Sequence, residues 1–399
     1  MYSHSLKCFN FTFQTAGGNA IPRKQEQMSI NNLGIKTPTA VIDTGIAANN
    51  LKQMLAKTHE HELMFRPHFK THQSVSIGAL FRKQGVDKIT VSSVMMAEYF
   101  ARHGWQDITI AFPVNLLEID QINHLAQSID LSLLIEAADT LEQLQESLRT
   151  ACGIFIKVDA GYRRTGVPAD DIERISELAE MIHHSPRTHL KGFLIHNGHT
   201  YNAGGPAEIR KIHDKSLKNL GELYEWKQRH YPNAIVSLGD TPALSIADNF
   251  ENVDELRPGN FIFYDVMQHY LGSCSLEDVA MAVACPVVAT HPSRNEVVIY
   301  GGAVHLSKDS IAINGKTIYG RIAMIRQSDW RILPASNYVK KLSQEHGVVH
   351  LDDGFIHQFE PGDLIMILPV HSCLIPPLLG NMIDTEGNTI SIMKNYRNE

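Results

Sequence analysis

The chain has 399 residues, of which 43% are hydrophobic and 20% are charged, a composition typical of a soluble globular protein with room for two domains. The net charge of −7 indicates no basic surface of the kind that binds nucleic acid. Five scattered cysteines, an odd number, favour a reducing compartment, so we expect a cytoplasmic protein. No apolar run approaches the roughly 18 residues of a membrane helix, so we expect no membrane partner.

The first residues of the chain lack the apolar core of a secretory signal peptide. Residues 1–29 are polar and of mixed composition. We expect them to form a poorly ordered extension, with the first folded segment beginning near Ile30.

Residues 45–270 alternate between short β-rich runs and longer helical stretches. This alternation predicts a (β/α)8 barrel. The alternative is a doubly wound open sheet, which predicts a glycine-rich phosphate turn after the first strand, and none is there. The expected strands are 63–69, 89–93, 108–112, 131–135, 154–158, 192–196, 235–238 and 260–263, and the expected helices are 73–83, 94–103, 116–127, 139–149, 169–184, 208–229 and the less regular 243–256.

From about residue 271 the helical periodicity ends, and short β-like runs separated by Gly, Pro and Asp take its place. We therefore expect a second, mainly β domain over 271–399. The segment 30–44 contains a strand-like run before the barrel and is expected to join this domain. The expected strands are 280–289, 296–300, 317–325, 347–351, 364–368 and 389–393.

Polar clusters accompany the expected barrel strands. In a barrel the carboxyl ends of the strands meet on one face, where the active site lies. Ordinary loop chemistry explains any one of these clusters, but it explains the whole series less well. The sequence therefore predicts one polar cavity. Clusters follow strands at Lys70, 92–93, 159–166, 196–201 and 239–242, and 257–260 introduces the expected eighth strand.

Lys70 lies in the segment 66–72, with histidines at 68 and 72 and an arginine at 66. A lysine that is held near other cations and partly removed from water loses basicity, and a neutral amine forms a Schiff base with an aldehyde. The alternative is a solvated lysine on a surface loop.

Gly239, Asp240 and Thr241 form a turn suited to an anion, because the glycine opens the backbone and the threonine adds a hydroxyl donor. Alone, such a turn is common. Loops after late barrel strands often hold phosphate. Together with Lys70, the turn suggests pyridoxal phosphate, with its phosphate in this loop and its aldehyde on the lysine.

His371 and Cys373 are two residues apart at an expected strand end, which would place both side chains on one face. Nitrogen and sulfur are ligands that Zn²⁺ prefers. Two protein ligands would leave positions for water or substrate. The alternative is a buried cysteine beside a histidine whose hydrogen bonds are satisfied.

Taken together, these motifs resemble those of the metal-activated fold-type III pyridoxal phosphate enzymes, the D-serine dehydratase and D-threonine aldolase family, which is related to alanine racemase. The resemblance runs from about Thr37 to Pro376. It implies a pyridoxal-phosphate-binding (β/α)8 barrel of the alanine racemase type with a second, mainly β C-terminal domain. The motifs that carry it are 66–72, 158–166, 239–242, 255–259, 345–347 and 371–373.

The resemblance also implies residue roles. Lys70 would be the Schiff-base lysine and the base that removes the α-proton. His196 would lie near the cofactor ring, and Arg257 is a candidate for the arginine that faces the pyridine nitrogen, although its place before the expected eighth strand makes that match loose. The other implied cofactor-binding residues are Gly239, Asp240, Thr241, Gly259 and Asn260 at the phosphate, with Tyr201, Tyr264 and Arg164 around the pocket. His371 and Cys373 would bind Zn²⁺ or another divalent metal.

The chain departs from the family pattern at two positions. Val370 replaces an asparagine before the His-x-Cys motif, and Asp240 replaces the serine of the phosphate loop. A carboxylate near a phosphate dianion is repulsive. We therefore expect Asp240 to contact the phosphate through its backbone, with its side chain turned away.

The implied activity is that of a lyase, dependent on pyridoxal phosphate and zinc, that acts on a small D-3-hydroxy amino acid. We favour D-serine dehydratase, which gives pyruvate and ammonia, over D-threonine aldolase, which gives glycine and an aldehyde. An amino-acid racemase and a non-catalytic cofactor-binding protein are further alternatives, and the His371–Cys373 pair counts against both. Because relatives of this fold pair head to tail, we expect a homodimer.

Overall fold

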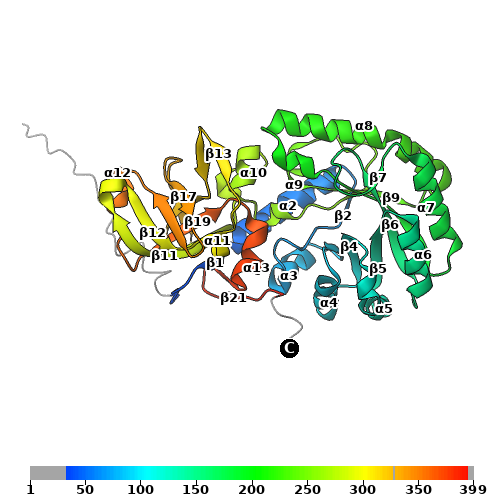
Figure 1. Cartoon of the computed structure of the whole chain (residues 1–399), viewed down its shortest axis with the longest axis horizontal. Helices are drawn as coiled ribbons and strands as arrows, with labels where there is room; N and C mark the ends of the chain where they lie inside the picture. Colours follow the sequence, from blue (N-terminus) through cyan, green and yellow to red (C-terminus); the bar gives the residue numbers. More distant parts are fainter. Residues whose placement is uncertain (1–32, 327–328, 394–399) are drawn as a thin grey trace, which may run out of the picture.

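The structure, a computed structural model, describes residues 33–326 and 329–393. The extension expected at residues 1–29 lies outside the described residues. Figure 1 shows two lobes, a sheet ringed by helices and a second lobe built mainly of strands, with helix α2 (Thr44–Glu60) running between them. The expected (β/α)8 barrel and mainly β second domain are both present.

The barrel is a parallel sheet in which the strands pair in the order β2-β10-β9-β8-β6-β5-β4-β3. It is closed by the backbone that follows β2, because the Thr90 N–H donates to Pro67 O and the Phe69 N–H donates to Thr90 O, each at 2.9 Å. The short β7 (Val167–Pro168) pairs with β6 at the rim. The barrel strands are β2 (Met64–Phe65), β3 (Lys88–Val91), β4 (Asp107–Pro113), β5 (Asp130–Ile135), β6 (Cys152–Asp159), β8 (Thr188–His196), β9 (Ile235–Gly239) and β10 (Glu255–Leu256).

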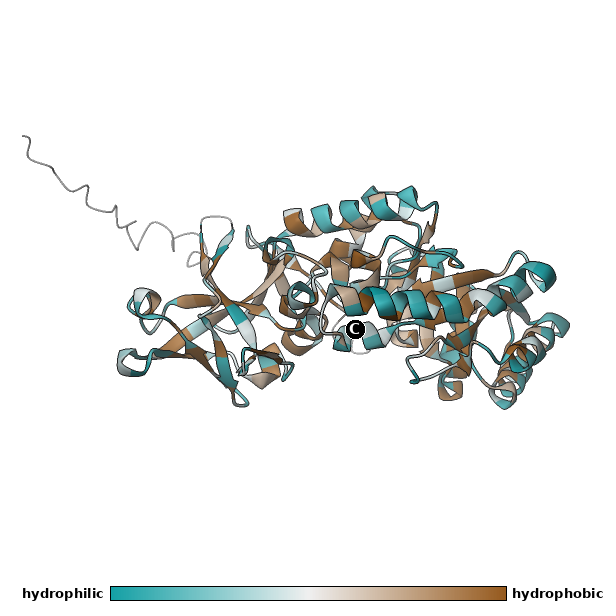
Figure 2. Cartoon of the chain, turned by 90° about the horizontal axis from the view of Figure 1, so that it is seen from above, coloured by the Kyte–Doolittle hydropathy of each residue, from teal (hydrophilic) through white to brown (hydrophobic). Residues whose placement is uncertain are grey.

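The barrel strands are buried on both faces because helices cover their outer side. Figure 2 shows the helices with hydrophilic outer surfaces around this apolar sheet. Several helices begin at a side-chain cap; the hydroxyls of Ser74 and Ser93, just after barrel segments, accept from the backbone N–H groups of Ile77 and Met96. The other helices of this lobe are α3 (Val75–Lys83), α4 (Val94–Arg102), η1 (Leu116–Glu118), α5 (Ile119–Ala126), α6 (Ala138–Ser147), α7 (Ile172–His184), η2 (Gly198–Asn202), α8 (Pro206–His230), α9 (Thr241–Ile246), η3 (Asn260–Ile262), α10 (Val266–Leu271) and η4 (Leu276–Asp278).

The expected eighth strand at 260–263 is wrong. This apolar run forms the 3-10 turn η3, with Phe261, Ile262 and Phe263 fully buried, and the eighth strand is the two-residue β10 before it. Apolar burial in a turn leaves the same sequence signal as a short buried strand. Arg257 therefore follows the eighth strand and lies at the same barrel end as Lys70.

The first strand and one helix are also shorter than expected. β2 ends at Phe65, two residues before a proline that cannot donate to a sheet. The helix expected at 243–256 is only the six residues of α9.

The second lobe is a mainly antiparallel sheet in the order β12-β18-β17-β15-β19-β11-β1-β20-β21, with β16 paired to β15. β1 pairs with β11 and β20, so the segment before the barrel joins this sheet. The strands are β1 (Thr39–Ile42), β11 (Met281–His291), β12 (Glu296–Tyr300), β15 (Gly320–Ile325), β16 (Trp330–Ile332), β17 (Tyr338–Leu342), β18 (His346–His350), β19 (Leu364–Pro369), β20 (Met382–Asp384) and β21 (Thr389–Ile390), with a separate hairpin of β13 (Ile311–Ile313) and β14 (Lys316–Ile318).

Short helices lie at the ends of these strands. α2 follows directly after β1 of this sheet and is held to the barrel lobe, because Asn50 Nδ2 donates to Ile262 O at 3.3 Å and to Asp278 O at 2.8 Å. Among the helices of the described residues, none is both long and apolar enough to span a bilayer. The helices of this lobe are η5 (Pro292–Arg294), α11 (Ala303–Leu306), α12 (Asp353–Ile356), η6 (Ser372–Leu374) and α13 (Ile375–Leu379).

Candidate active site

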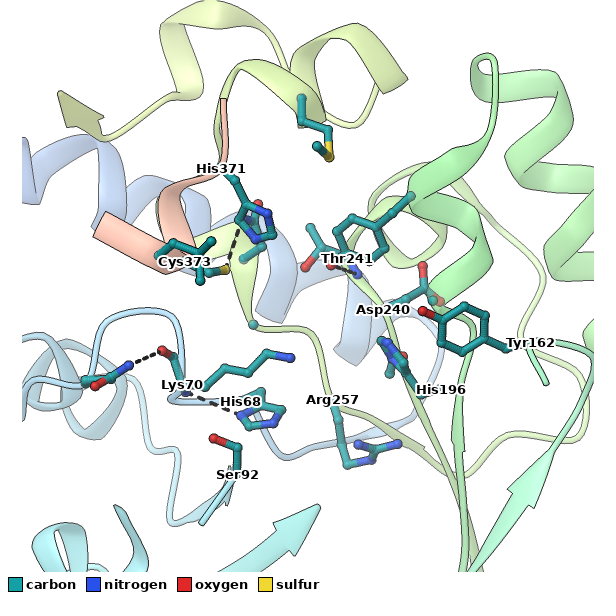
Figure 3. A pocket seen from close by; sticks show the side chains of 18 of the residues that line it. His68, Lys70, Ser92, Tyr162, His196, Asp240, Thr241, Arg257, His371 and Cys373 are labelled. Carbon is teal, nitrogen blue, oxygen red and sulfur yellow. Dashed lines mark hydrogen bonds between the residues drawn. The ribbon is translucent and has the colours of Figure 1, made fainter. Parts of the chain in front are cut away.

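A cavity of about 540 Å³ lies at the carboxyl ends of the barrel strands, and η6 and α13 of the β lobe form part of its wall. Figure 3 shows side chains from both lobes pointing into it. All but two of the expected site residues line it: Lys70, His196, Tyr201, Gly239, Asp240, Thr241, Arg257, Gly259, Asn260, His371 and Cys373.

Lys70 extends into this cavity, and its Nζ has no hydrogen-bond or ion-pair partner among the described residues (Figure 3). Its side chain is open to the cavity but surrounded by protein. Burial lowers the pKa of Lys70, and the charges of Arg164 and Arg257 lower it further against the opposing effect of Cys373. A larger share of the amine is therefore neutral and able to act as a base or nucleophile.

Two histidines beside Lys70 are uncharged at neutral pH. Burial and then the nearby lysine hold the pKa of His68 well below its ordinary value, and they lower that of His196 to about 3. His196 Nδ1 hydrogen-bonds to the Gly239 carbonyl, which can only accept. The His196 Nδ1 therefore carries the proton, and its Nε2 keeps a lone pair.

Arg257 is held by a buried hydrogen-bonded chain that crosses the barrel. Its Nε donates to Ser237 Oγ at 2.6 Å, and Ser237 Oγ donates to Glu255 Oε1 at 2.6 Å. Glu255 also accepts from Arg66 Nε at 2.9 Å, and Arg66 pairs with Asp107. Burial lowers the pKa of Arg257 to about 10, so it stays a cation at neutral pH.

The rest of the Arg257 guanidinium is also fixed. Nη2 donates to the carbonyls of Ile195 and Ser237, whereas no hydrogen bond of Nη1 is found among the described residues. The Nη1 group of the guanidinium can therefore donate to a ligand in the cavity.

The Asp240 side chain turns away from the cavity face of its loop, as expected. Its Oδ1 accepts from the Ala243 N–H at 2.7 Å and from Thr200 Oγ1 at 3.0 Å, so it caps α9. Burial raises its pKa to about 7, which reduces its negative charge. Serine and aspartate both cap helices well, which explains why either residue fits this position.

The loop fits a phosphate in two further respects. Thr241 Oγ1 is buried and has no hydrogen-bond partner among the described residues, so a bound acceptor would satisfy it. A Cβ on Gly239 would lie 3.0 Å from Arg257 O, and a Cβ on Gly259 would lie 3.0 Å from His68 O. Such contacts are tighter than most Cβ contacts, so glycine is favoured at both positions, and both glycines line the cavity. The Tyr201 hydroxyl accepts from the Thr241 N–H at 3.4 Å and closes one side.

His371 and Cys373 lie at the opposite wall from the barrel loops (Figure 3). They do not continue a strand as expected; β19 ends at Pro369, and η6 turns both side chains into the cavity. Burial opposes charge on both, but their mutual attraction prevails, so the pKa of the imidazole is raised and that of the thiol is lowered. The pair thus favours thiolate and imidazolium.

Barrel residues hold the sulfur in place. Thr71 Oγ1 lies 3.2 Å from Cys373 Sγ, and Asn260 Nδ2 donates to the same sulfur at 3.3 Å. A soft thiolate beside an imidazole fits a Zn²⁺ ion, which would displace the imidazole proton. Within the described residues no group of three or more His, Cys, Asp or Glu is arranged to hold a metal. The pair would therefore leave open coordination positions.

Two expected residues lie outside the lining. The Arg164 guanidinium lies over the Tyr162 ring, 5.1 Å from its centroid, and acts on Lys70 through its charge. The Tyr264 hydroxyl is 3.1 Å from Ser245 Oγ, behind α9. Tyr264 is thus part of the packing below the site.

The cavity also contains residues that sequence reasoning did not assign to it. The Tyr162 ring packs edge-on against His196, with 5.7 Å between ring centroids, and its place in the motif 158–166 was an available signal. Asp265 and Asp309 support the loop that carries His371 and Cys373, and no spacing in the sequence marks either one.

The comparisons with known proteins agree with this geometry. The family model described as the alanine racemase N-terminal domain matches residues 42–266, which is more than half of the chain. The chain belongs to this family. A second model, a serine dehydratase domain, matches residues 280–383, which contain the His371–Cys373 pair. The family expected from the sequence motifs, with its fold, is confirmed.

Among curated proteins, the chain is 27% identical to the D-threo-3-hydroxyaspartate dehydratase of a Delftia species, over 86% of this chain and 92% of that protein. It is also 27% identical to the D-serine dehydratase of Dictyostelium discoideum, over 92% and 97% of the two chains. A D-threonine aldolase of Arthrobacter is 22% identical over 84% and 86%.

Among solved structures, that of the Delftia dehydratase superposes with a TM-score of 0.81 at 25% identity, covering 90% of this chain and 98% of that one. Two mutants of that enzyme were also solved, a histidine-to-alanine mutant and a cysteine-to-alanine mutant in the metal-free form, with substituted positions two residues apart. Alanine racemase from Clostridium difficile shares the fold, with a TM-score of 0.62 at 12% identity.

Proposed function

We propose that this chain is a pyridoxal-phosphate-dependent lyase that removes water from a small D-3-hydroxy amino acid, with D-serine as the preferred substrate and pyruvate and ammonia as products. The observation that carries this proposal is the meeting of Lys70 with the His371–Cys373 pair in one cavity. Relatives named D-serine dehydratase and D-threo-3-hydroxyaspartate dehydratase match along most of the chain and support it.

The residues of the cavity have different roles in this reaction. When bound, pyridoxal phosphate supplies an electron sink for the α-carbon, and Zn²⁺ supplies a Lewis acid for the β-hydroxyl. The neutral amine of Lys70 takes the proton from Cα. Arg257 stays a cation at neutral pH and would hold the cofactor ring with its pyridine nitrogen unprotonated. Loss of the α-proton and the β-hydroxyl yields an enamine, which water converts to pyruvate and ammonia.

We assign the phosphate to Thr241 and to the backbone of Gly239 and Gly259, and the metal to His371 and Cys373. The buried, unpartnered Thr241 hydroxyl and the nitrogen–sulfur donor set support these assignments. Zinc is preferred over harder divalent metals because thiolate is a soft ligand.

Product analysis tests this proposal. Purified protein with pyridoxal phosphate and Zn²⁺ should release pyruvate from D-serine, a chelator should abolish the release, and added Zn²⁺ should restore it. Lys70→Ala should be inactive under the same conditions. Glycine release from D-threonine, with no product from D-serine, would show an aldolase instead. Formation of L-serine alone would show a racemase.

We further propose that the active form is a homodimer in the cytoplasm. Leu374 on the cavity wall and Leu378 on α13 are 42% and 40% exposed, and Phe112, near the end of β4, is 58% exposed. A second subunit packed on this face would cover these side chains. The free cysteines Cys152, Cys274, Cys285 and Cys373 suit a reducing compartment.

A further inference from the structure

Asp309 contacts the imidazole ring of His371 at its Nδ1. It belongs to the segment between α11 and β13, more than sixty residues before the histidine. Its Oδ2 is 3.2 Å from His371 Nδ1. This is an ion-pair contact without the alignment of a hydrogen bond, since the buried oxygen has no hydrogen-bond partner among the described residues. Asp309 does not line the cavity, whereas His371 does.

The backbone that carries Asp309 is held in an uncommon conformation. Ser307 has φ 63° and ψ 179°, a region that glycine populates readily and that costs other residues about 1–3 kcal/mol. Its hydroxyl accepts from the Asp309 N–H at 3.1 Å, and Ser307 itself is buried. Such strain persists only where the surroundings over-determine the conformation. The backbone that leads to Asp309 is therefore fixed by its neighbours.

A carboxylate at Nδ1 decides which imidazole nitrogen is free. Because a carboxylate accepts hydrogen bonds, the proton of a neutral His371 stays on Nδ1, and Nε2 presents its lone pair. Carboxylates placed in this way beside metal-binding histidines orient the ring and raise its basicity. Asp309 itself is not part of any group of three potential ligands in the described residues.

A second buried carboxylate fixes the backbone of the same segment. Asp265 Oδ2 accepts from the Ser372 N–H at 3.0 Å and from Asn260 Nδ2 at 2.7 Å. The peptide between His371 and Cys373 is thus tied to the barrel lobe. The main motion left to His371 is rotation of its imidazole ring about the side-chain bonds. The contact with Asp309 restricts this rotation.

From this geometry we propose that Asp309 is a positioning residue for the metal: it holds the His371 ring so that Nε2 faces the ion together with Cys373 Sγ. This inference rests on the metal site assigned under the proposed function. It predicts that loss of the Asp309 carboxylate weakens metal binding while leaving cofactor binding intact.

Metal titration of the cofactor-loaded protein, stripped of metal by a chelator, tests the proposal. The Zn²⁺ dissociation constant should rise roughly 10- to 100-fold in Asp309→Ala, and less in Asp309→Asn, whose amide oxygen can still accept the hydrogen bond. Asp353→Asn is the matched control, because Asp353 lies in the same lobe and contacts Asn295 instead of a cavity residue. Its Zn²⁺ affinity should equal that of the wild type.

Two readouts separate positioning from a general structural role. The pyridoxal phosphate affinity and the unfolding temperature of Asp309→Asn should match those of the wild type. With Co²⁺ in place of Zn²⁺, the visible ligand-field bands should change in Asp309→Ala and stay unchanged in Asp353→Asn. Equal Zn²⁺ affinity in wild type and Asp309→Ala would overturn the role of Asp309 alone. A wild-type protein that binds no Zn²⁺ would overturn the metal site and this inference together, while pyruvate formation would still test the lyase.

Discussion

Three buried side chains, those of Ser237, Glu255 and Arg66, fix the direction of the Arg257 guanidinium. Arg257 is held through Ser237 to Glu255, and the negative charge of Glu255 is shared with Arg66. The serine accepts from one partner and donates to the other, so its hydroxyl proton has one orientation. The cavity-facing nitrogen of Arg257 is thereby fixed in direction before any ligand binds.

Replacing Ser237 by alanine should loosen this chain. The Glu255 oxygen and the Arg257 Nε would each lose a buried partner, at a cost of about 1–3 kcal/mol. We expect Ser237→Ala to weaken pyridoxal phosphate binding about tenfold, which equals about 1.4 kcal/mol, and to shift the absorption band of the bound cofactor. Spectrophotometric titration measures both.

Ser132→Ala provides the comparison for this variant, because Ser132 is equally buried on the barrel strand β5 but has no contact with Arg257. It should bind the cofactor as the wild type does. If the two variants bind alike, the buried chain has no part in holding the cofactor.

Sequence reasoning found Lys70 and the His371–Cys373 pair because each lies in a short motif. It did not find Asp309, because that contact joins residues 62 positions apart through a strained loop. It placed Tyr264 in the pocket, although its hydroxyl bonds to Ser245. Local motifs thus predicted residues that line the cavity, whereas the residues that contact them from behind are set by the tertiary fold.

At the scale of elements, the alternation of apolar runs predicted the barrel because parallel strands are buried on both faces. It failed where an apolar run forms a turn, as at η3, and where a buried strand carries a charge, as at β10 with Glu255. Period-2 spacing correctly placed His371 and Cys373 on one face, but for the wrong reason, since η6 is a 3-10 turn. Whether such a short segment forms a strand or a turn is decided by its tertiary contacts.

The cap of α9 gives the cofactor-free protein a pH-dependent stability. Because the folded-state pKa of Asp240 is raised to about 7 from its ordinary 3.8, protonation favours the fold. This contribution is complete below about pH 4 and is lost as the pH rises through 7, by at most about 4 kcal/mol at about 1.4 kcal/mol per pKa unit.

Asp240→Asn should remove this dependence, because asparagine caps helices equally well and carries no charge. Relative to the wild type, the variant should gain stability at pH 8 compared with pH 5. Urea unfolding of the cofactor-free proteins at the two pH values measures the difference. If the difference in unfolding free energy between the variant and the wild type is the same at both pH values, Asp240 is ionised throughout.

At the scale of the whole molecule, the site exists only where the two lobes meet. Lys70 comes from the barrel and the His371–Cys373 pair from the β lobe, and Thr71 and Asn260 connect them at the sulfur. β1 pairs with β11 in the β lobe and leads directly into α2, whose Asn50 bonds to Ile262 O in the barrel lobe. The distance between Lys70 and the His371–Cys373 pair is therefore set by the packing of the two lobes.

The exposed leucines on α13 and just before it test the proposed dimer. A double substitution of Leu374 and Leu378 by aspartate places two charges on the face that would be buried. We expect it to shift the protein from dimer to monomer in sedimentation velocity and to lower its activity. Val288→Asp, at another exposed apolar residue in the β lobe, should leave the dimer intact. A monomeric wild type would contradict the assembly.

The central claim is that Lys70 carries the cofactor aldehyde. Borohydride reduction of the protein loaded with pyridoxal phosphate, followed by peptide mass spectrometry, tests it most directly. We predict one modified lysine, at position 70, and no specific label in Lys70→Ala. A stoichiometric label on another lysine, such as the buried Lys157, would contradict the account.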